Sequence, residues 1–172
     1  METDLAYQDE PWEELIDGKI VAMSPGPAWN HISIGGNLYR IFSNFLHGKK
    51  CTPIPDGMDL YLTEKDRFIP DLMVVCDPSI IKSNGVHGAP DLVVEILSPS
   101  TQRHDRFTKF CLYQRAGVRE YWIVDPDNRI VQSFVLEDGR YSVKEFGAAG
   151  DKIKVNVLED CVIDLSEVFS EA

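Results

Sequence analysis

Apolar and polar positions along this chain predict a hairpin followed by a long helix in its first quarter. An Asp-Gly pair at 17–18 separates apolar runs at 15–16 and 20–23, and this arrangement is a strong signal for a β-hairpin. Residues 28–47 then carry apolar side chains at three- and four-residue spacing, which predicts an amphipathic helix.

The middle of the chain predicts a second helix enclosed by strands. Short apolar runs bounded by turn residues are typical of buried strands, whereas apolar positions three and four residues apart indicate a helix. The polar turn at 63–67 joins the first two runs as a second hairpin, and a polar loop at 82–90 follows. The predicted elements are strands at 58–62, 68–75, 91–97 and 120–125, and a helix at 104–117.

The order of these elements predicts the fold class. A helix between two strands implies that the strands at 91–97 and 120–125 run parallel. A further hairpin turns at Asp138-Gly139. We therefore expect an α/β (α+β) fold, with a mixed β-sheet core flanked by helices and added hairpins at both termini. No linker interrupts the pattern, so residues 1–172 are expected to form a single domain.

Composition and charge narrow the classes of function. A hydrophobic content of 44% and a charged content of 26% are ordinary for a soluble protein. No signal peptide or membrane span is recognisable, so we expect a cytoplasmic protein without a membrane partner. The net charge of −11 opposes the sequence-independent DNA binding that a basic face provides.

Cysteine usage agrees with a reducing compartment. The four cysteines show no CxxC pair, which argues against a zinc site. Cys76 and Cys111 lie in apolar runs and are expected to be small core residues. Without a secretion signal, we expect the thiols to be reduced.

Acidic residues interrupt two of the predicted strands. Glu95 lies between Val94 and Ile96, and a glutamate is almost never fully buried unless it is paired. Asp71 lies on the neighbouring predicted strand, and pairing of the two strands would bring the carboxylates within about 5 Å. Two such carboxylates repel unless a cation or a proton lies between them, which suits Mg²⁺. A structural salt bridge of Glu95 is the alternative.

Other polar residues allow a structural and a functional interpretation. Asp91 begins its strand about 13 Å from Glu95, so we expect it to be structural. Lys109, on the helix after the Glu95 strand, is either solvated or close enough to orient a water or a phosphate. His31 is either a buried structural histidine or a contact to substrate or to an acid.

The segment between the Glu95 strand and the following helix is the one locally basic stretch near these acids. Ser98 is by default a loop or cap residue. Together with Arg103 and Arg106, it could accommodate a phosphate backbone.

These motifs, taken in order, resemble the Uma-type family of restriction endonucleases in the PD-(D/E)xK nuclease superfamily. The resemblance is carried by "PDLMVV" at 70–75, by "PDLVVEILSPST" at 90–101 and by the D, K, Y, "AGV" and "EYWIVDP" series that follows. "ELIDGKIVAMSP" followed by His31, and the closing "IDLSEVF", are also similar. The resemblance covers roughly residues 12–169.

The resemblance implies a restriction-endonuclease-like αβββαβ core and metal-dependent hydrolysis of DNA phosphodiester bonds. Asp71 would bind Mg²⁺ or Mn²⁺, Glu95 would be the acid of the (D/E)xK element, and Ile96 would add its backbone carbonyl. Leu97 occupies the lysine position, and Lys109 matches a lysine that has migrated to the next helix.

The implied catalytic residues are therefore Asp71, Glu95 and Lys109, with His31, Ser98 and Arg103 as candidates for substrate binding. Cutting both DNA strands would suit a homodimer. The alternative is an inactive nuclease-fold module that binds protein or nucleic acid, which the acidic charge and the missing motif lysine favour. A small-molecule enzyme lacks support, because the sequence has no Gly-rich phosphate loop and no nucleophile elbow.

Overall fold

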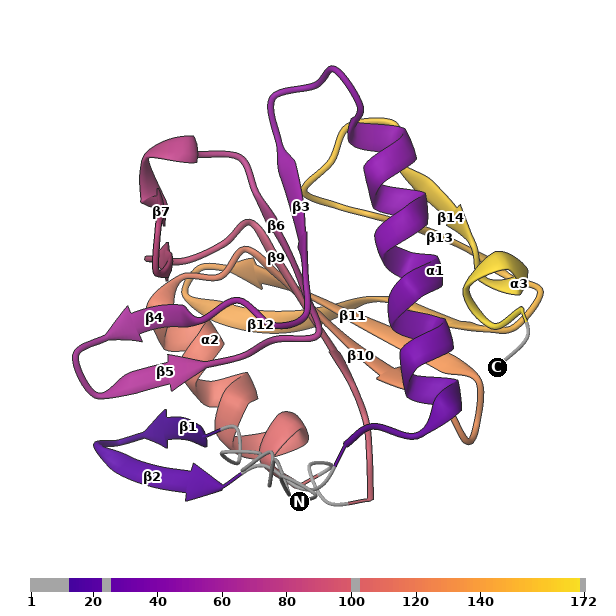
Figure 1. The fold of residues 1–172 in the computed structure, drawn as a ribbon. Coiled ribbons are helices and arrows are strands. Elements are labelled where there is room, and N and C mark those ends of the chain that lie inside the picture. The colour runs from indigo at the N-terminus through magenta and orange to yellow at the C-terminus, as the bar shows by residue number, and fades with distance from the viewer. Residues whose placement is uncertain (1–12, 23–25, 100–102, 171–172) are drawn as a thin grey trace, which may run out of the picture.

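A mixed sheet of six strands forms the centre of the molecule (Figure 1). The computed structural model describes residues 13–22, 26–99 and 103–170, and the strand order of this large sheet is β12-β11-β10-β9-β6-β3. Neighbours β9 and β10 run parallel, as predicted, and the remaining neighbours run antiparallel. The strands are β3 (Thr52–Pro55), β6 (Leu72–Val75), β9 (Leu92–Ile96), β10 (Glu120–Asp125), β11 (Ile130–Glu137) and β12 (Arg140–Ala148).

A second, smaller sheet has the order β2-β1-β5-β4-β8-β7. Its first two strands form the predicted hairpin around Asp17 and Gly18, whose positive φ angles of 52° and 73° fit the tight turn. A separate two-stranded ladder pairs β13 (Lys152–Lys154) with β14 (Val162–Asp164). The strands of the smaller sheet are β1 (Glu13–Ile16), β2 (Lys19–Ala22), β4 (Leu60–Thr63), β5 (Asp66–Phe68), β7 (Ile81–Lys82) and β8 (Gly85–His87).

Helices cover both faces of the large sheet. The predicted helix at 28–47 is α1 (Trp29–Leu46). The second predicted helix is a π-helical turn, η2 (His104–Lys109), which continues as α2 (Phe110–Ala116) and ends at Gly117 with a φ of 89°. Two short helices, η1 (Pro78–Ile80) and α3 (Leu165–Val168), complete the set. None of the helices within the described ranges is long and apolar enough to cross a membrane.

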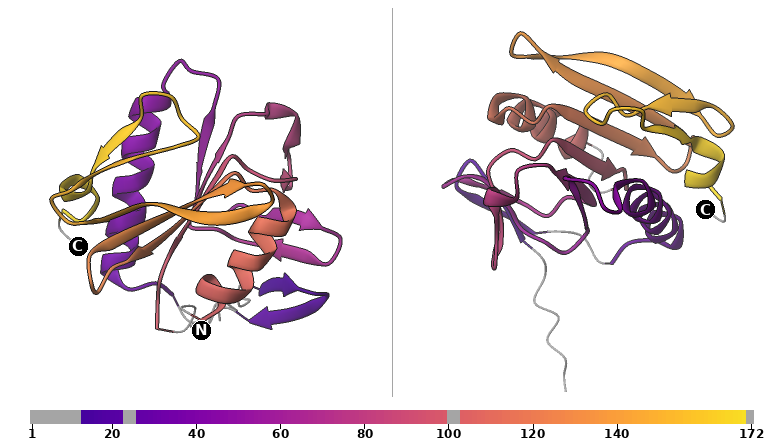
Figure 2. Two further views of the ribbon diagram at one scale, coloured as in Figure 1. Left: turned by 180° about the vertical axis from the view of Figure 1, so that it is seen from behind. Right: turned by 90° about the horizontal axis from the view of Figure 1, so that it is seen from above.

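The layers explain where the core lies. The buried face of α1 and the C-terminal segment pack against one side of the large sheet, and α2 with the smaller sheet packs against the other (Figure 2). Alternate residues of the central strands therefore enter different cores: Val94 and Ile96 face α1, whereas Val93 and Leu97 face α2. Burial on both faces accounts for the apolar residues on either side of Glu95 in β9.

Two predictions about the strands were only partly right. The predicted hairpin around the polar turn is present as the antiparallel pair of β4 and β5, but the run at 68–75 divides between the two sheets: Phe68 ends β5 and Leu72 begins β6. Pro70, which lacks an N–H, lies at the division. The polar loop at 82–90 contains part of a short β7–β8 hairpin, and β8 pairs with β4.

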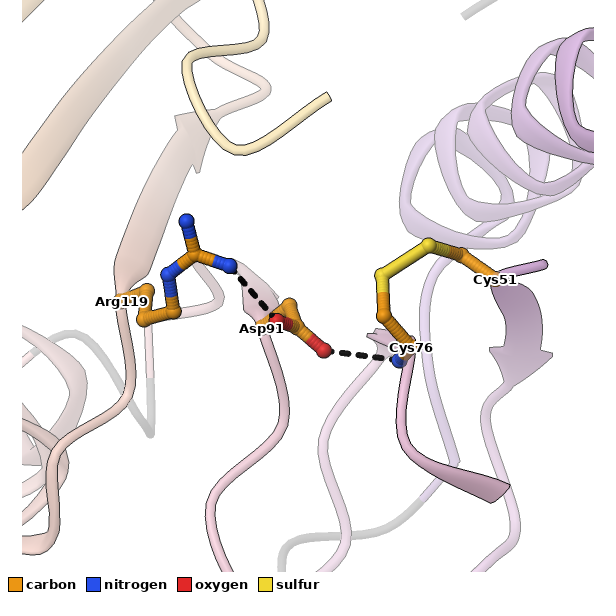
Figure 3. Close-up of a disulfide and its surroundings, with 4 residues drawn as sticks. All are labelled: Cys51, Cys76, Asp91 and Arg119. Atoms are coloured by element: carbon orange, nitrogen blue, oxygen red, sulfur yellow. Dashed lines mark hydrogen bonds and ion pairs between the residues drawn. A yellow bond between two sulfur atoms is a disulfide. The ribbon is translucent and has the colours of Figure 1, made fainter. Parts of the chain in front are cut away.

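The expectation for the cysteines was wrong. Cys76 does not act as a reduced core residue but forms a disulfide with Cys51, at the adjoining ends of β6 and β3 (Figure 3). Cys111 is exposed on α2, and Cys161 is buried. The apolar neighbours of Cys111 misled the sequence interpretation, because its own position lies on the outer side of the helix.

Candidate active site

The two strand acids lie opposite each other. Strands β6 and β9 are antiparallel, with Leu72 opposite Val94, and the same register continued by one residue sets Asp71 opposite Glu95. Directly opposite residues point to the same face of a sheet. The Asp71 Oδ2 atom also accepts the backbone N–H of Ile96 at 2.6 Å, which fixes this carboxylate against the end of β9.

Lys109 lies inside a cluster of carboxylates. Its Nζ atom is 3.2 Å from Glu95 Oε1, 2.9 Å from Glu14 Oε1 and 3.4 Å from Asp105 Oδ1. The Tyr113 hydroxyl donates to the same Glu95 oxygen at 2.6 Å. The lysine side chain is only 2% exposed, so it does not point into solvent. We call Lys109 and its three carboxylates the lysine cluster.

The pKa values of Glu95 and Lys109 are both raised within the lysine cluster. Burial raises the pKa of Glu95 well above the usual range; the Lys109 charge opposes this shift, and the charges of Asp105, Asp71 and Glu14 add to it. Burial alone would lower the pKa of Lys109, but the three carboxylates outweigh it and hold that pKa well above normal. One ammonium therefore serves three acids.

His31 reaches the same region from α1. Its Nε2 atom lies 3.2 Å from Asp71 Oδ1. Burial would lower the histidine pKa, but the hydrogen bond and charge of Asp71, the charge of Asp56 and a backbone contact to Ile96 raise it. The imidazole is therefore partly buried and contacts an acid, which agrees with both sequence interpretations.

The sequence did not identify four other residues of this region: Glu14, Asp56, Asp105 and Tyr113. Glu14 arrives from the N-terminal hairpin and also accepts the Ile69 N–H at 3.3 Å. Asp56 follows β3, and partial burial and the Asp71 charge raise its pKa. Of the remaining two, only Asp105 could have been predicted from the sequence, because it precedes Lys109 by four residues, one helical turn.

Three sequence-predicted residues lie outside this group. Asp91 accepts the Cys76 N–H at 2.7 Å and pairs with Arg119 at 2.9 Å (Figure 3), so it is structural as expected. Ser98 is half-buried just beyond β9, and Arg103 is exposed at the start of the helix that carries Lys109. Both flank the site, and neither joins the lysine cluster.

The donors fit a divalent cation that prefers oxygen ligands. Within the described part of the chain, no three His, Cys, Asp or Glu side chains are grouped closely enough to enclose a metal. Mg²⁺ commonly uses only one or two carboxylates, together with waters and substrate phosphates. Asp71 and Glu95 supply that number of carboxylates.

A comparison with protein-family models shows to which family the chain belongs. The model of the Uma2 family, described as "Putative restriction endonuclease", matches residues 2–166. The chain belongs to the Uma2 family. The sequence resemblance is therefore confirmed.

Two curated relatives of this Uma2 protein come from a cyanobacterium. The uncharacterized protein slr1290 of Synechocystis sp. is 40% identical over 101 residues, which cover 58% of this chain and 53% of slr1290. The uncharacterized protein sll1609 of the same organism is 28% identical over 116 residues, which cover 65% of each. The chain thus spans about half to two thirds of the length of these relatives.

A solved structure establishes the fold. The crystal structure of a "putative nuclease belonging to DUF820" from Anabaena variabilis superposes with a TM-score of 0.75 over 94% of this chain and 91% of that one, at 21% identity. The Uma2 chain therefore has the mixed α+β fold of that protein, and the predicted fold class is confirmed.

Proposed function

We propose that this Uma2 protein is a metal-dependent endonuclease that hydrolyses phosphodiester bonds of DNA. The observation that carries the proposal is the meeting of Glu95 and Lys109, 3.2 Å apart and buried, although they come from a strand and a separate helix. The motif lysine position holds Leu97, a core residue. Lys109, on the next helix, nevertheless places an ammonium beside the motif acid Glu95.

The acids have the role of holding the metal. Asp71 and Glu95 would bind Mg²⁺ or Mn²⁺, and the backbone carbonyl of Ile96 would join them. When bound, such an ion lowers the pKa of a water and stabilises charge on the phosphate. His31 orients Asp71 through their 3.2 Å contact, and the Ile96 N–H holds the other carboxylate oxygen.

Lys109 has the role of a fixed positive charge. Its raised pKa keeps the ammonium protonated at neutral pH, so it orients the attacking water or the phosphate and does not act as a base. Glu14 and Asp105 hold the ammonium beside Glu95. Ser98 and Arg103, which flank the site, would contact the DNA backbone. We also propose that residues 1–172 form one domain that acts as a cytoplasmic homodimer, since two symmetric sites would cut both strands.

Cleavage of supercoiled plasmid tests this proposal. Wild type with Mg²⁺ or Mn²⁺ should nick or linearise the plasmid, and Glu95→Gln and Lys109→Met should each slow cleavage by about a hundredfold or more. Glu137→Gln is the matched control, because this exposed strand glutamate lies on β11 and pairs only with surface groups. It should cleave like wild type.

The outcomes separate the alternatives. Wild-type rates in Glu95→Gln would refute the assignment of this site. Absence of cleavage by wild type with either ion would favour the second candidate, an inactive nuclease-fold module that binds protein or nucleic acid. The acidic net charge is the observation that keeps this candidate under test.

A further inference from the structure

A small cavity of about 100 Å³ lies on the same face of the large sheet as the lysine cluster. Strands β10, β11 and β12 form its floor, and the helical turn η2, which carries Lys109, contributes one wall. The residues that line it are Arg106, Ile123, Asp125, Ile130, Gln132 and Phe146. None of them belongs to the site described above.

The strand register relates the cavity to the candidate active site. Glu95 is opposite Ile123, Ile123 is opposite Gln132, and Gln132 is opposite Phe146. These four residues form one transverse row across β9, β10, β11 and β12. With neighbouring strands about 4.8 Å apart, the backbone of Gln132 lies about 10 Å from that of Glu95. A nucleotide next to a phosphate bound at Glu95 could reach this distance.

The walls combine an aromatic ring with polar groups that can still form hydrogen bonds. The ring of Phe146 is 62% exposed, although it adjoins a cavity. Arg106 donates to Gln132 Oε1 at 3.2 Å and lies 3.5 Å from Asp125 Oδ2. Among the described residues no partner is found for the amide nitrogen of Gln132, which remains able to donate.

This chemistry suits a nucleobase better than a phosphate. Arg106 is already neutralised by Asp125, whose own charge would repel an anion. An amide donor and a guanidinium can instead meet the acceptors on a base edge, while Phe146 offers a ring for stacking. A base stacked inside a duplex has no free face for the ring, whereas an unpaired, unstacked base does.

We propose that this pocket binds an unpaired base of the DNA substrate, adjacent to the phosphate that is cut. The proposal rests on the proposed nuclease function and adds its substrate class, which is DNA with a single-stranded or splayed segment. The net charge of −11 opposes binding of the DNA backbone in single-stranded or duplex form. Stacking and base-edge contacts in the pocket are therefore the interactions that would supply affinity.

Binding of a short fluorescein-labelled oligodeoxynucleotide, in EDTA to prevent cleavage, tests the pocket directly. Fluorescence anisotropy would compare the single strand with the same sequence as a duplex. Phe146→Ala should weaken single-strand binding at least about fivefold, since stacking contributes about 1–3 kcal/mol per base. Gln132→Ala should weaken it in the same direction. Val162→Ala, which trims an equally exposed apolar side chain on β14, should bind like wild type.

The results distinguish this proposal from the nuclease function. Wild type that does not bind the single strand, or Phe146→Ala and Gln132→Ala proteins that bind it unchanged, would overturn the pocket even if plasmid cleavage is robust. Loss of binding in Phe146→Ala would support the pocket even if wild type cleaves nothing. Phe146 is exposed, so circular dichroism should show that its replacement leaves the fold intact.

Discussion

Replacing Lys109 by methionine would leave three buried carboxylates without their cation. Methionine is an unbranched side chain of similar length, so the change removes the charge without opening a large cavity. The side chains of Glu14, Glu95 and Asp105 are at most 6% exposed, and each has an oxygen within 3.4 Å of the Lys109 Nζ atom. None of them can turn into water without disrupting the packing around it.

The size of the stability loss in Lys109→Met follows from the burial of the lysine cluster. Removing one partner of a buried ion pair costs about 3–5 kcal/mol, because the remaining charge is uncompensated. This is a large share of the roughly 5–15 kcal/mol that stabilises a domain. With a urea dependence of about 2 kcal/mol per molar, the unfolding midpoint should fall by about 2 M.

Urea unfolding followed by tryptophan fluorescence measures this loss, because Trp122 is fully buried. Lys144→Met is the matched control: Lys144 pairs with Glu137 at 2.7 Å, but both are on the surface, so its loss should be at most about 1 kcal/mol. The double variant Lys109→Met/Glu14→Gln should recover part of the stability, because it removes one of the unpaired charges.

The pH dependence of folding stability independently checks the predicted direction of this effect. A carboxyl whose pKa is raised on folding binds its proton more tightly in the folded state, so stability falls as the pH rises above the ordinary glutamate value of about 4.3. Without Lys109, the pKa of Glu95 should rise further. The gap between variant and wild type should therefore narrow in acid and widen toward neutral pH. Wild-type stability of Lys109→Met at neutral pH would refute the lysine cluster.

Other parts of the fold give equally specific expectations. Asp91→Ala should lower the free energy of unfolding by about 1–3 kcal/mol, because Asp91 accepts the partly buried Cys76 N–H. Arg119→Ala should lower it by at most about 1 kcal/mol, because the Arg119 side chain is 61% exposed. Equal losses of stability in thermal unfolding would contradict this. In the native, unreduced protein a thiol reagent should label Cys111 quickly and Cys161 slowly, because burial raises the pKa of the Cys161 thiol to about 11. Peptide mass spectrometry would show this, and rapid labelling of Cys51 or Cys76 would contradict the disulfide.

The elements that the sequence predicted well are those with long, local patterns. Helix α1 repeats its apolar spacing over eighteen residues, and the parallel β9–β10 pair follows from the helix between its strands. The proximity of Asp71 to Glu95 was also predictable, because Asp71 directly precedes the apolar run of β6, Glu95 lies within β9, and these two runs pair. These inferences depend on neighbours in the chain and on one strand pairing.

The parts that could not be predicted depend on distant segments. Nothing in the spacing connects Glu14 with Lys109, because the hairpin that carries Glu14 resembles an ordinary solvent-exposed one. The smaller sheet is built from strands of two to four residues, too short for a periodic signal. Strand β3 was missed because it contains Pro53 and Pro55, and without it the disulfide between Cys51 and Cys76 could not be anticipated.

Those two prolines also affect how copies of this protein can associate. Strand β3 is one edge of the large sheet, and only Thr52 and Ile54 have N–H groups to donate toward β6, so the outer edge of β3 lacks donors at Pro53 and Pro55. A sheet protected at one edge can accept an added strand only along the other, at β12. Edge-to-edge pairing through this sheet can therefore join two molecules but cannot propagate into a fibre.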